Sequence, residues 1–246
     1  MEAMKECRVI WALVLGLMVA GCAATNSAED GHVTVSDPFE NVNRFFFDLN
    51  QRLDRNAGRP AATAYRDTVP GSVRVGLHNV LDNLGGPVTV ANNLLQVRLE
   101  SAGIATGRFL VNTTVGVAGI FDVASDWGMP ARNRDFGETM GTYGVPPGPY
   151  LVLPFRGSTD VRDFAGNYLD GYATPLRYVR YEGRNYVGLM KSTLGSINNR
   201  ANNLVTYRDI ERASVDYYAT MRTWYLERRA RLIEDTPVRT AELPDF

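Results

Sequence analysis

Cysteine and histidine are scarce in this chain of 246 residues, which contains two of each. Cys7 and Cys22 lie near the N-terminus, while His32 and His78 lie far apart in the sequence. This spacing provides no set of ligands for zinc. The chain also lacks a Gly-x-Ser-x-Gly motif and a glycine-rich phosphate loop followed by lysine. These absences predict a protein that is not an enzyme and that holds no metal or cofactor.

An excess of charge and long apolar runs are missing as well. The formal net charge is −1, so the composition gives no basic surplus of the kind that nucleic acid attracts. After the N-terminal region, no stretch approaches the roughly 18 consecutive apolar residues of a membrane-spanning helix. Any later contact with a membrane is therefore expected to be lateral.

Residues 1–21 have the pattern of a bacterial secretory signal. Lys5 and Arg8 precede an apolar run over residues 9–20. The run is too short to cross roughly 30 Å of hydrocarbon, but it suits a signal peptide. It ends in small residues followed by Cys22, the form of a lipobox, in which the cysteine is acylated and the chain is cut before it. The pattern predicts Cys22 as a covalent lipid anchor; the alternative is an ordinary signal with a chance cysteine.

The rest of the chain predicts a mainly α-helical fold. We expect a small, polar, flexible tether at residues 22–36, a single helical domain at 37–235 and a C-terminal tail at 236–246. No sustained alternation of apolar and polar residues predicts a sheet.

Several helix boundaries follow from local signals. Asp37 as N-cap before Pro38 predicts a helix that runs to about Arg55. Gly85-Gly86-Pro87 predicts the end of a second helix, and further helices are expected at 87–99 and 100–113. Ser158 is expected to cap a helix with Val161, Phe164, Tyr168 and Leu169 facing inward. Residues 185–233 predict two more helices.

The first helix has an unusually wide apolar arc. Phe39 and Phe46 lie on its central stripe, and Phe45 and Phe47 lie on either side. We expect these phenylalanines to contact membrane lipid, with Phe45 or Phe47 against acyl chains. The alternative is that all of them pack in the core, as a ring of helices could allow.

Two further sets of residues are candidates for function. Asn43, Asn199, Arg222 and Arg228 are candidate contacts for a lipid head group, since amides need polar partners in hydrocarbon and guanidinium groups suit phosphates. The alternatives are an exposed helical face, a solvated basic face or a partner contact. Gly144, Gly148, Pro149 and Tyr150 lie in a connector rich in proline and glycine, which predicts a hinge or gate.

The most specific motifs resemble the MlaA/VacJ lipoprotein family over residues 37–232. They are Asp37-Pro38-Phe39-Glu40, Tyr65-Arg66-Asp67, Val69-Pro70, Leu94-Leu95-Gln96, Asp135-Phe136-Gly137-Glu138-Thr139, Gly148-Pro149-Tyr150, Leu153-Pro154-Phe155 and Asp216-Tyr217. Two positions depart from the pattern. Arg156 stands where an apolar or aromatic residue is usual, and Val215 stands where proline is common.

The resemblance implies a flat, ring-like body with a central amphipathic channel, embedded in the inner leaflet of the outer membrane. Ala23, rather than Asp, after the lipidated cysteine agrees with that destination. The resemblance further implies a trimeric porin as partner. Mislocalised phospholipid would be removed from the outer leaflet and passed to a soluble periplasmic carrier similar to MlaC. The alternative function is a structural, porin-associated lipoprotein without a lipid path.

Overall fold

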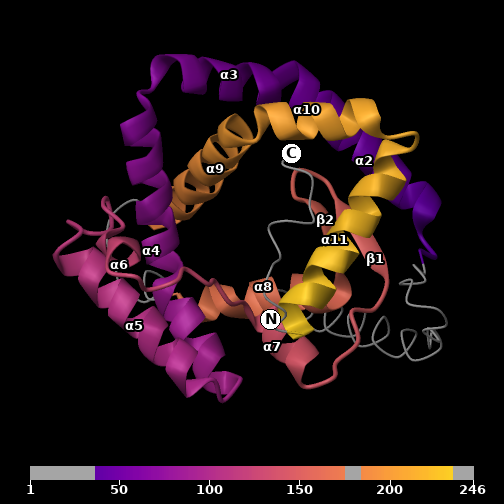
Figure 1. Cartoon of the computed structure of the whole chain (residues 1–246). Coiled ribbons are helices and arrows are strands. Elements are labelled where there is room, and N and C mark those ends of the chain that lie inside the picture. The colour runs from indigo at the N-terminus through magenta and orange to yellow at the C-terminus, as the bar shows by residue number, and fades with distance from the viewer. Residues whose placement is uncertain (1–36, 175–183, 235–246) are drawn as a thin grey trace, which may run out of the picture.

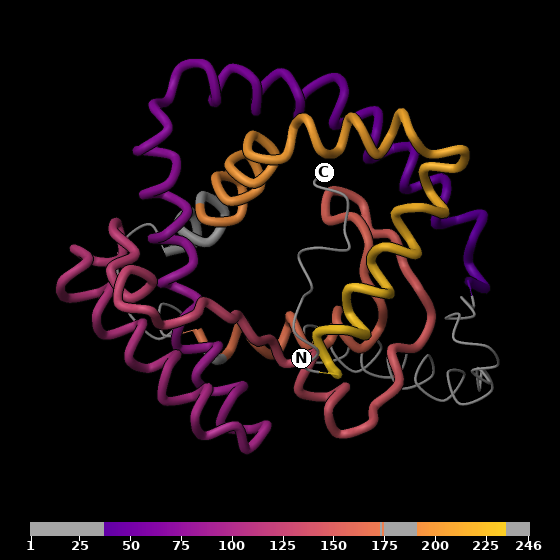
Figure 2. Tube along the Cα trace, viewed as in Figure 1, coloured from indigo at the N-terminus to yellow at the C-terminus, as the bar shows by residue number. Residues whose placement is uncertain are grey.

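The computed structural model describes residues 37–174 and 184–234. The predicted signal peptide, Cys22, the tether and the C-terminal tail lie outside these residues. In the described part, helices follow one another around a common centre and form a ring (Figures 1 and 2). The mainly α-helical, ring-like fold is therefore confirmed. No helix in the described ranges has the length and apolar character needed to cross a membrane.

The elements succeed one another around the ring as follows. They are α2 (Glu40–Leu53), the π-helical turn η1 (Asp54–Gly58), α3 (Arg59–Thr68), α4 (Gly71–Leu95), α5 (Leu99–Thr114), α6 (Val123–Asp126), α7 (Phe136–Thr142), β1 (Tyr150–Leu153), β2 (Gly157–Asp160), α8 (Val161–Ala173), α9 (Arg184–Asn202), α10 (Leu204–Ala213) and α11 (Tyr217–Glu234). In Figure 1, α3 and α10 close one side and α7 with α8 the opposite side, while α5 and α6 lie outside α4.

The start of α2 differs from the prediction. The helix begins at Glu40 after a turn, and Asp37 does not cap it. The Asp37 carboxylate instead accepts hydrogen bonds from Asn43 Nδ2 at 2.8 Å and from Arg222 at 3.0 Å, and another from the Tyr218 hydroxyl. These partners on α2 and α11 use the carboxylate for tertiary contact, so it is not available to the first turn of the helix.

Helix α4 continues through Gly85-Gly86-Pro87, where the sequence predicted an end. A Cβ atom at Gly86 would lie 2.9 Å from a ring carbon of Phe109 on α5. The glycine therefore permits close packing of two helices instead of terminating one. Pro87 removes one backbone donor, and the packed helix tolerates that loss.

The structure contains a short β-hairpin, whereas the sequence predicted no sheet. The four-residue strands β1 and β2 pair antiparallel, with Tyr150 opposite Asp160 and Leu153 opposite Gly157. The three residues Pro154 to Arg156 form the turn, and Phe155 there adopts a left-handed φ of 63°. Strands this short contain too few residues for alternation to be recognised in the sequence.

The aromatic core consists of Phe47, Tyr150, Val152 and Tyr218 and lies between α2, the hairpin and α11. The Phe47 ring centroid lies 5.4 Å from that of Tyr217 and 5.5 Å from that of Tyr218, both in edge-on geometry. Such contacts add to the hydrophobic stabilisation of large buried rings. The core thus fixes the hairpin against the two helices that flank it.

The expectations for the second half of the chain need two corrections. Asp160, and not Ser158, caps α8 by accepting a 2.7 Å hydrogen bond from the Asp163 amide. Phe164, Tyr168 and Leu169, which were expected to face inward, are exposed. In addition, residues 184–234 form three helices where two were predicted, because a break at Asn203 separates α9 from α10.

Candidate functional site

Two adjoining cavities are lined by the elements that surround the centre of the ring. The α9 cavity, of about 840 Å³, lies between α4, α8 and α9. The α11 cavity, of about 820 Å³, lies between α7, β2, α8 and α11. Arg156 and Asn167 line both cavities, so the two spaces meet at the tip of the hairpin and the middle of α8.

Most residues that line the α9 cavity have polar side chains. Lys191, Ser192, Ser196 and Asn199 of α9 line one side. Burial lowers the pKa of Lys191, and the nearby charge of Asp82 partly opposes this shift. The wall therefore contains a cation that has lost part of its hydration.

A network of buried charges forms one wall of the α11 cavity. The Arg229 guanidinium donates to Asp135 at 2.7 Å and to Asp163 at 2.7 Å, and it lies 3.4 Å from Glu138. Arg134 also donates to Glu138, at 3.2 Å. Burial, with the nearby charge of Asp135, raises the pKa of Glu138 to about 7. Since each of these carboxylates has an arginine partner, the network is a structural frame.

A second buried carboxyl group lies behind this wall. Burial raises the pKa of Asp160 to about 6, and the charge of Asp163 acts in the same direction. The Tyr225 hydroxyl donates to Asp163 at 2.6 Å. These contacts tie α11 to the beginning of α8.

Two other arginines of the cavities have no such partner. Arg156 at the hairpin tip has no carboxylate within ion-pair distance among the described residues, and its guanidinium carbon lies 5.8 Å from the Phe164 ring centroid. Arg228 on α11 is exposed and lies 5.4 Å from the Trp224 ring centroid, again with no carboxylate in the described ranges. Both cations can therefore bind an anion that enters the cavities.

The candidates for head-group contact divide into two pairs. Asn199 lines the α9 cavity and Arg228 lines the α11 cavity, so the structure places both where a ligand could reach them. Arg222 instead forms an ion pair with Asp37 and approaches Glu40 at 3.7 Å, away from both cavities. The charge of Arg222 therefore serves tertiary packing, and its contact with a head group stays a prediction.

The role expected for Asn43 is wrong. The side chain is only 2% exposed. Its Nδ2 donates to the Tyr150 carbonyl at 2.9 Å, and its Oδ1 accepts from the Val152 amide at 2.9 Å. Asn50, two turns later, contacts the Leu153 carbonyl and the Phe155 amide in the same way. The two amides therefore pair with β1 as a neighbouring strand would, and they fix the hairpin to α2.

The four phenylalanines of α2 and its start occupy different environments. Phe47 is buried in the aromatic core, so the expected lipid contact of this residue is wrong. Phe46 is partly buried against the same core. Phe39 is exposed, and Phe45 is 65% exposed, so lipid contact stays a prediction for these two.

The connector expected to be a hinge is held in several places. Gly144 and Gly148 adopt φ values of 82° and 71°, a region that favours glycine. Arg162, however, donates from its backbone amide to the Pro147 carbonyl and from its side chain to the Val145 carbonyl, both at 3.2 Å.

The C-terminal end of this connector is fixed as well. Tyr150 is buried in the aromatic core, so it cannot serve as a pivot, and that part of the hinge prediction is wrong. Pro149, next to it, is half-buried. Movement at Gly144, Gly148 and Pro149 stays a prediction.

Sequence reasoning did not identify Arg156, Asn167 or Lys191 as candidates for the site. The motif pattern noted Arg156 only as a departure, although a charged residue in a Pro-Phe-Arg-Gly turn was a usable signal. Asn167 and Lys191 have no distinctive local pattern. Their importance comes from the way α8, α9 and the hairpin meet.

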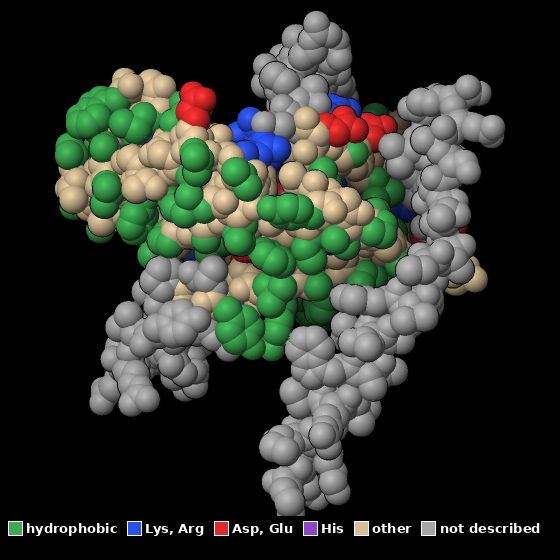
Figure 3. Space-filling model, turned by 90° about the horizontal axis from the view of Figure 1, so that it is seen from below, with side chains coloured by type: hydrophobic (Ala, Val, Ile, Leu, Met, Phe, Trp, Pro, Cys, Tyr) green, Lys and Arg blue, Asp and Glu red, His purple; other side chains and the backbone are tan. Residues whose placement is uncertain are grey.

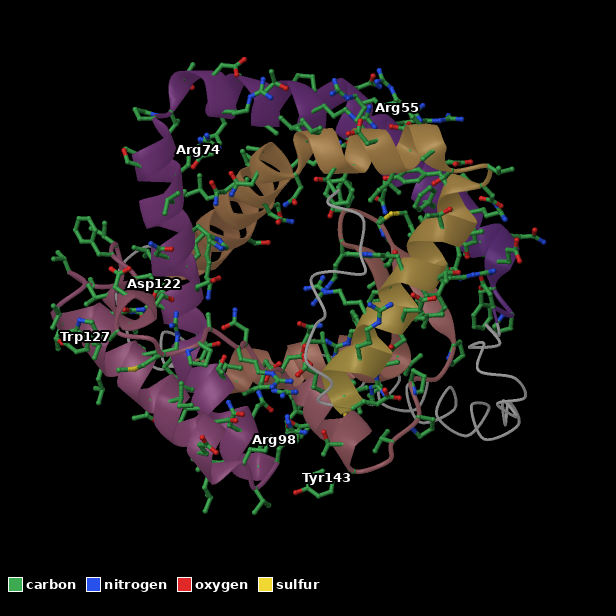
Figure 4. All side chains as sticks on the ribbon, viewed as in Figure 1. Arg55, Arg74, Arg98, Asp122, Trp127 and Tyr143 are labelled. Atoms are coloured by element: carbon green, nitrogen blue, oxygen red, sulfur yellow. The ribbon has the colours of Figure 1, made fainter. Side chains whose placement is uncertain are left out.

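The outer surface of the ring is apolar over a long segment. Figure 3 shows hydrophobic side chains spread over one side of the molecule, with charged side chains mainly near one edge. The apolar lobe (residues 94–127) contributes the exposed side chains Leu94, Leu95, Val97, Leu99, Leu110, Val115, Val117, Ile120, Phe121 and Trp127. Trp127 and, beside the lobe, Tyr143 point away from the centre (Figure 4).

The apolar lobe has an internal frame of its own. Arg108 donates to both carboxylate oxygens of Asp122, at 2.9 and 3.0 Å, and Asn112 donates to the same group at 2.8 Å. Burial opposes ionisation here, but hydrogen bonds from Ser125, Asn112 and Arg108 lower the pKa of Asp122 to about 2. Arg108, Asn112 and Asp122 thus pair with one another inside the segment, while its large apolar side chains face outward.

The fold and the cavities define a helical ring with polar and charged side chains in its cavity walls and an apolar outer surface over residues 94–127. The family described as MlaA lipoprotein matches residues 35–232. The chain therefore belongs to the MlaA lipoprotein family.

Similar proteins cover most of the chain. The intermembrane phospholipid transport system lipoprotein MlaA of Escherichia coli (strain K12) is 34% identical over 239 residues, covering 95% of this chain and 92% of that protein. The protein with the same description from Haemophilus influenzae is 31% identical, covering 94% of this chain and 92% of the other. An uncharacterised protein of Rickettsia conorii is 37% identical over 198 residues, covering 80% of this chain and 78% of that protein.

A solved structure is similar as well. It comes from work on the structural basis for maintenance of bacterial outer membrane lipid asymmetry. The TM-score is 0.74 at 34% identity, with coverage of 80% of this chain and 99% of the other.

Proposed function

We propose that this protein moves phospholipid out of the outer membrane through the centre of its helical ring and passes it to a soluble periplasmic carrier. Family membership and relatives named for intermembrane phospholipid transport support this function. The structural observation that carries it is the pair of adjoining cavities joined at Arg156 and Asn167. Together they offer a continuous polar wall to a head group.

The distribution of apolar side chains supports a position in one leaflet of the outer membrane. In α4, Thr89, Asn92 and Asn93 are buried, while large side chains such as Val75 and Leu94 are exposed. A protein surrounded by water favours the opposite arrangement, whereas a ring surrounded by lipid exposes apolar side chains and pairs its amides internally. A lipid on Cys22 would hold the domain at that surface, and a trimeric porin would be the lateral partner.

The proposed mechanism contains no step of bond chemistry. The charged residues of the cavity walls are assigned to structural pairing and to the binding of a head group. A passive path can only equilibrate lipid between its two ends. The direction of transport must therefore come from the affinity of the acceptor and from the components beyond it.

Blocking the junction of the cavities tests the proposal. Asn167 is exposed on α8 and lines both cavities, so Asn167→Trp places an indole where the path would pass. Leu169→Trp is the matched control, because Leu169 is exposed on the same helix and lines neither cavity. We expect phospholipid to accumulate in the outer leaflet with Asn167→Trp alone, at normal protein level and porin association.

A scaffold without a lipid path makes the opposite forecast. In that case, lipid asymmetry would follow porin association and would be equally normal in the two tryptophan variants. Normal asymmetry with Asn167→Trp, at normal protein level, would therefore remove the proposed path and favour the structural function.

A further inference from the structure

The two cavities contain positive charges that the protein leaves unpaired. Arg156 lines both cavities, Lys191 lines the α9 cavity, and Arg228 lines the α11 cavity. Among residues 37–174 and 184–234, none of these cations has a carboxylate within ion-pair distance. Most other arginines of the ring contrast with this: Arg44, Arg59, Arg108, Arg200 and Arg229 all form ion pairs.

Most carboxylates that line the same cavities are already occupied. Asp135 and Glu138 are paired with arginines, as described above, and Arg229 also holds Asp163. Asp170 accepts from Asn92 Nδ2 at 2.9 Å and from the Phe136 amide at 2.9 Å. Asp82 is the exception, because its close partner among the described residues is the His78 imidazole at 3.6 Å, and its charge partly balances Lys191. The binding capacity left open in the walls is therefore mainly cationic.

The surroundings of Arg156 suit a ligand that is anionic at one end and apolar beyond it. The guanidinium lies above the Phe164 ring, and Phe164 is itself exposed. Phe155, the neighbour of Arg156 in the hairpin turn, is 86% exposed. A planar guanidinium can donate two parallel hydrogen bonds to a phosphate, while adjacent rings offer apolar contact to the chains that follow it.

We propose that Arg156, with Lys191 on one side and Arg228 on the other, binds the phosphate of a phospholipid head group where the two cavities meet. The inference rests on the proposed function, because a phospholipid must enter the ring to reach this site. Arg156 is the central ligand since it alone of the three lines both cavities. Lys191 and Arg228 then extend the favourable potential into each cavity, so that a head group can pass along the wall.

Binding of short-chain lipids to the full-length, lipidated protein in a non-ionic detergent tests the site. The probes are dihexanoyl phosphatidylglycerol, dihexanoylglycerol without a phosphate, glycerol 3-phosphate and inorganic phosphate. Titration calorimetry measures the affinity of the protein for each probe. We expect Arg156→Gln to weaken binding of the phosphatidylglycerol at least tenfold and to leave binding of dihexanoylglycerol unchanged. Arg156→Lys should restore part of the affinity, since it keeps the charge and loses the paired donors.

Arg212→Gln is the matched control. Arg212 is an exposed arginine at the end of α10 and lines neither cavity. We expect lipid affinity to be unchanged in this variant. In the wild type, affinity for the charged probe should fall as salt rises from about 50 to about 500 mM, because ions screen a partly exposed charge pair.

The outcomes separate this site from the proposed function. If the wild type binds the phosphatidylglycerol and Arg156→Gln binds it equally well, the phosphate site is refuted while lipid transport stands. If the wild type binds the phosphate probes but neither lipid, the proposed function fails. If inorganic phosphate binds as tightly as the lipid, and Arg156→Gln weakens both equally, the site belongs to a free anion and the head-group assignment is overturned.

Discussion

The two sides of the ring differ in which side chains they bury and which they expose. Around the hairpin, the aromatic core is buried and polar side chains connect elements distant in sequence, as Asn43 does between α2 and β1. Around α4 and α5, the buried side chains are small or polar, and large apolar residues such as Leu99 and Leu110 are exposed. The hairpin side therefore has an apolar core, whereas the α4–α5 side has no large apolar side chain among its buried residues.

This contrast indicates which part of the ring is rigid. The hairpin side combines hydrophobic burial with hydrogen bonds that cannot be replaced by water, so its geometry is strongly determined. On the α4–α5 side, buried polar side chains such as Asn92 bond to α7 and α8, and large apolar side chains are exposed. The hairpin side can therefore hold Arg156 at the cavity junction as a rigid frame.

The largest expected effect on the free energy of unfolding is at the close crossing of α7 and α8, on the hairpin side of the ring. A Cβ atom at Gly166 would lie 2.3 Å from the backbone nitrogen of Gly137. Gly166→Ala should force the two helices apart and lower the free energy of unfolding by about 3 kcal/mol. Gly171→Ala, in the same helix with nothing within 4 Å, should instead stabilise by about 0.5 kcal/mol. Chemical denaturation in detergent measures both; equal effects would show that the crossing is not tight.

A smaller loss is expected when the pairing between α2 and β1 is removed. Asn43→Leu leaves the Tyr150 carbonyl and the Val152 amide buried without partners. We expect the free energy of unfolding to fall by about 2 kcal/mol, since an unsatisfied buried group keeps its desolvation cost. Asn199→Leu, at an exposed position on α9, should change it by less than about 0.5 kcal/mol. An equal loss in the two variants would contradict the role of Asn43.

The buried carboxyl groups of the rigid side predict an unusual dependence on pH. Burial raises the pKa of Glu138 from 4.5 to about 7 and that of Asp160 from 3.8 to about 6. From pH 4.5 to about pH 7 for Glu138, and from pH 3.8 to about pH 6 for Asp160, the folded state binds more protons than the unfolded state. The free energy of unfolding therefore falls as the pH rises through these ranges. The groups with lowered pKa, such as Asp122 at about 2, lose their contribution only in more acidic solution.

We therefore expect a loss of about 1.5 kcal/mol between about pH 5 and about pH 8. Thermal unfolding across this range provides the measurement. Glu138→Gln should flatten the profile, since the amide does not ionise. Stability that rises steadily from pH 5 to pH 8 would contradict the burial of these charges.

The fold class could be predicted from the sequence because helical periodicity and capping residues act locally. Boundaries failed where tertiary contact competed with a local signal: Asp37 binds Tyr218 and Arg222 instead of capping, and Gly86 accommodates Phe109 within a continuous helix. Both residues have the local pattern of a helix end. Their partners lie far away in the chain, where no periodicity points to them.

The candidate site was predictable only in part for the same reason. Asn199 and Arg228 line the cavities, whereas Asn43 and Arg222, with similar chemistry, belong to the frame. A polar residue beside an apolar stripe can face a ligand or a neighbouring backbone, and the stripe alone does not distinguish the two. The tertiary partners decide between them: β1 for Asn43 and Asp37 for Arg222.

The smallest effect on the free energy of unfolding is expected at Phe45. This residue also distinguishes the two interpretations of the phenylalanines, contact with lipid and packing in the core. The side chain is 65% exposed and contacts Phe46 edge-on, with ring centroids 5.4 Å apart. Phe45→Ser should therefore change the free energy of unfolding by less than about 0.5 kcal/mol. If the exposed ring enters the bilayer, the same variant should weaken vesicle binding about tenfold, since burying one aromatic side chain contributes roughly 1.5 to 3 kcal/mol. Flotation of the full chain carrying Cys22→Ser, which removes the proposed lipid anchor, isolates this contribution. Phe45→Leu should retain most of it because it keeps an apolar side chain. Unchanged flotation of Phe45→Ser would show that this part of α2 faces water or a protein partner, and would restrict lipid contact to the apolar lobe.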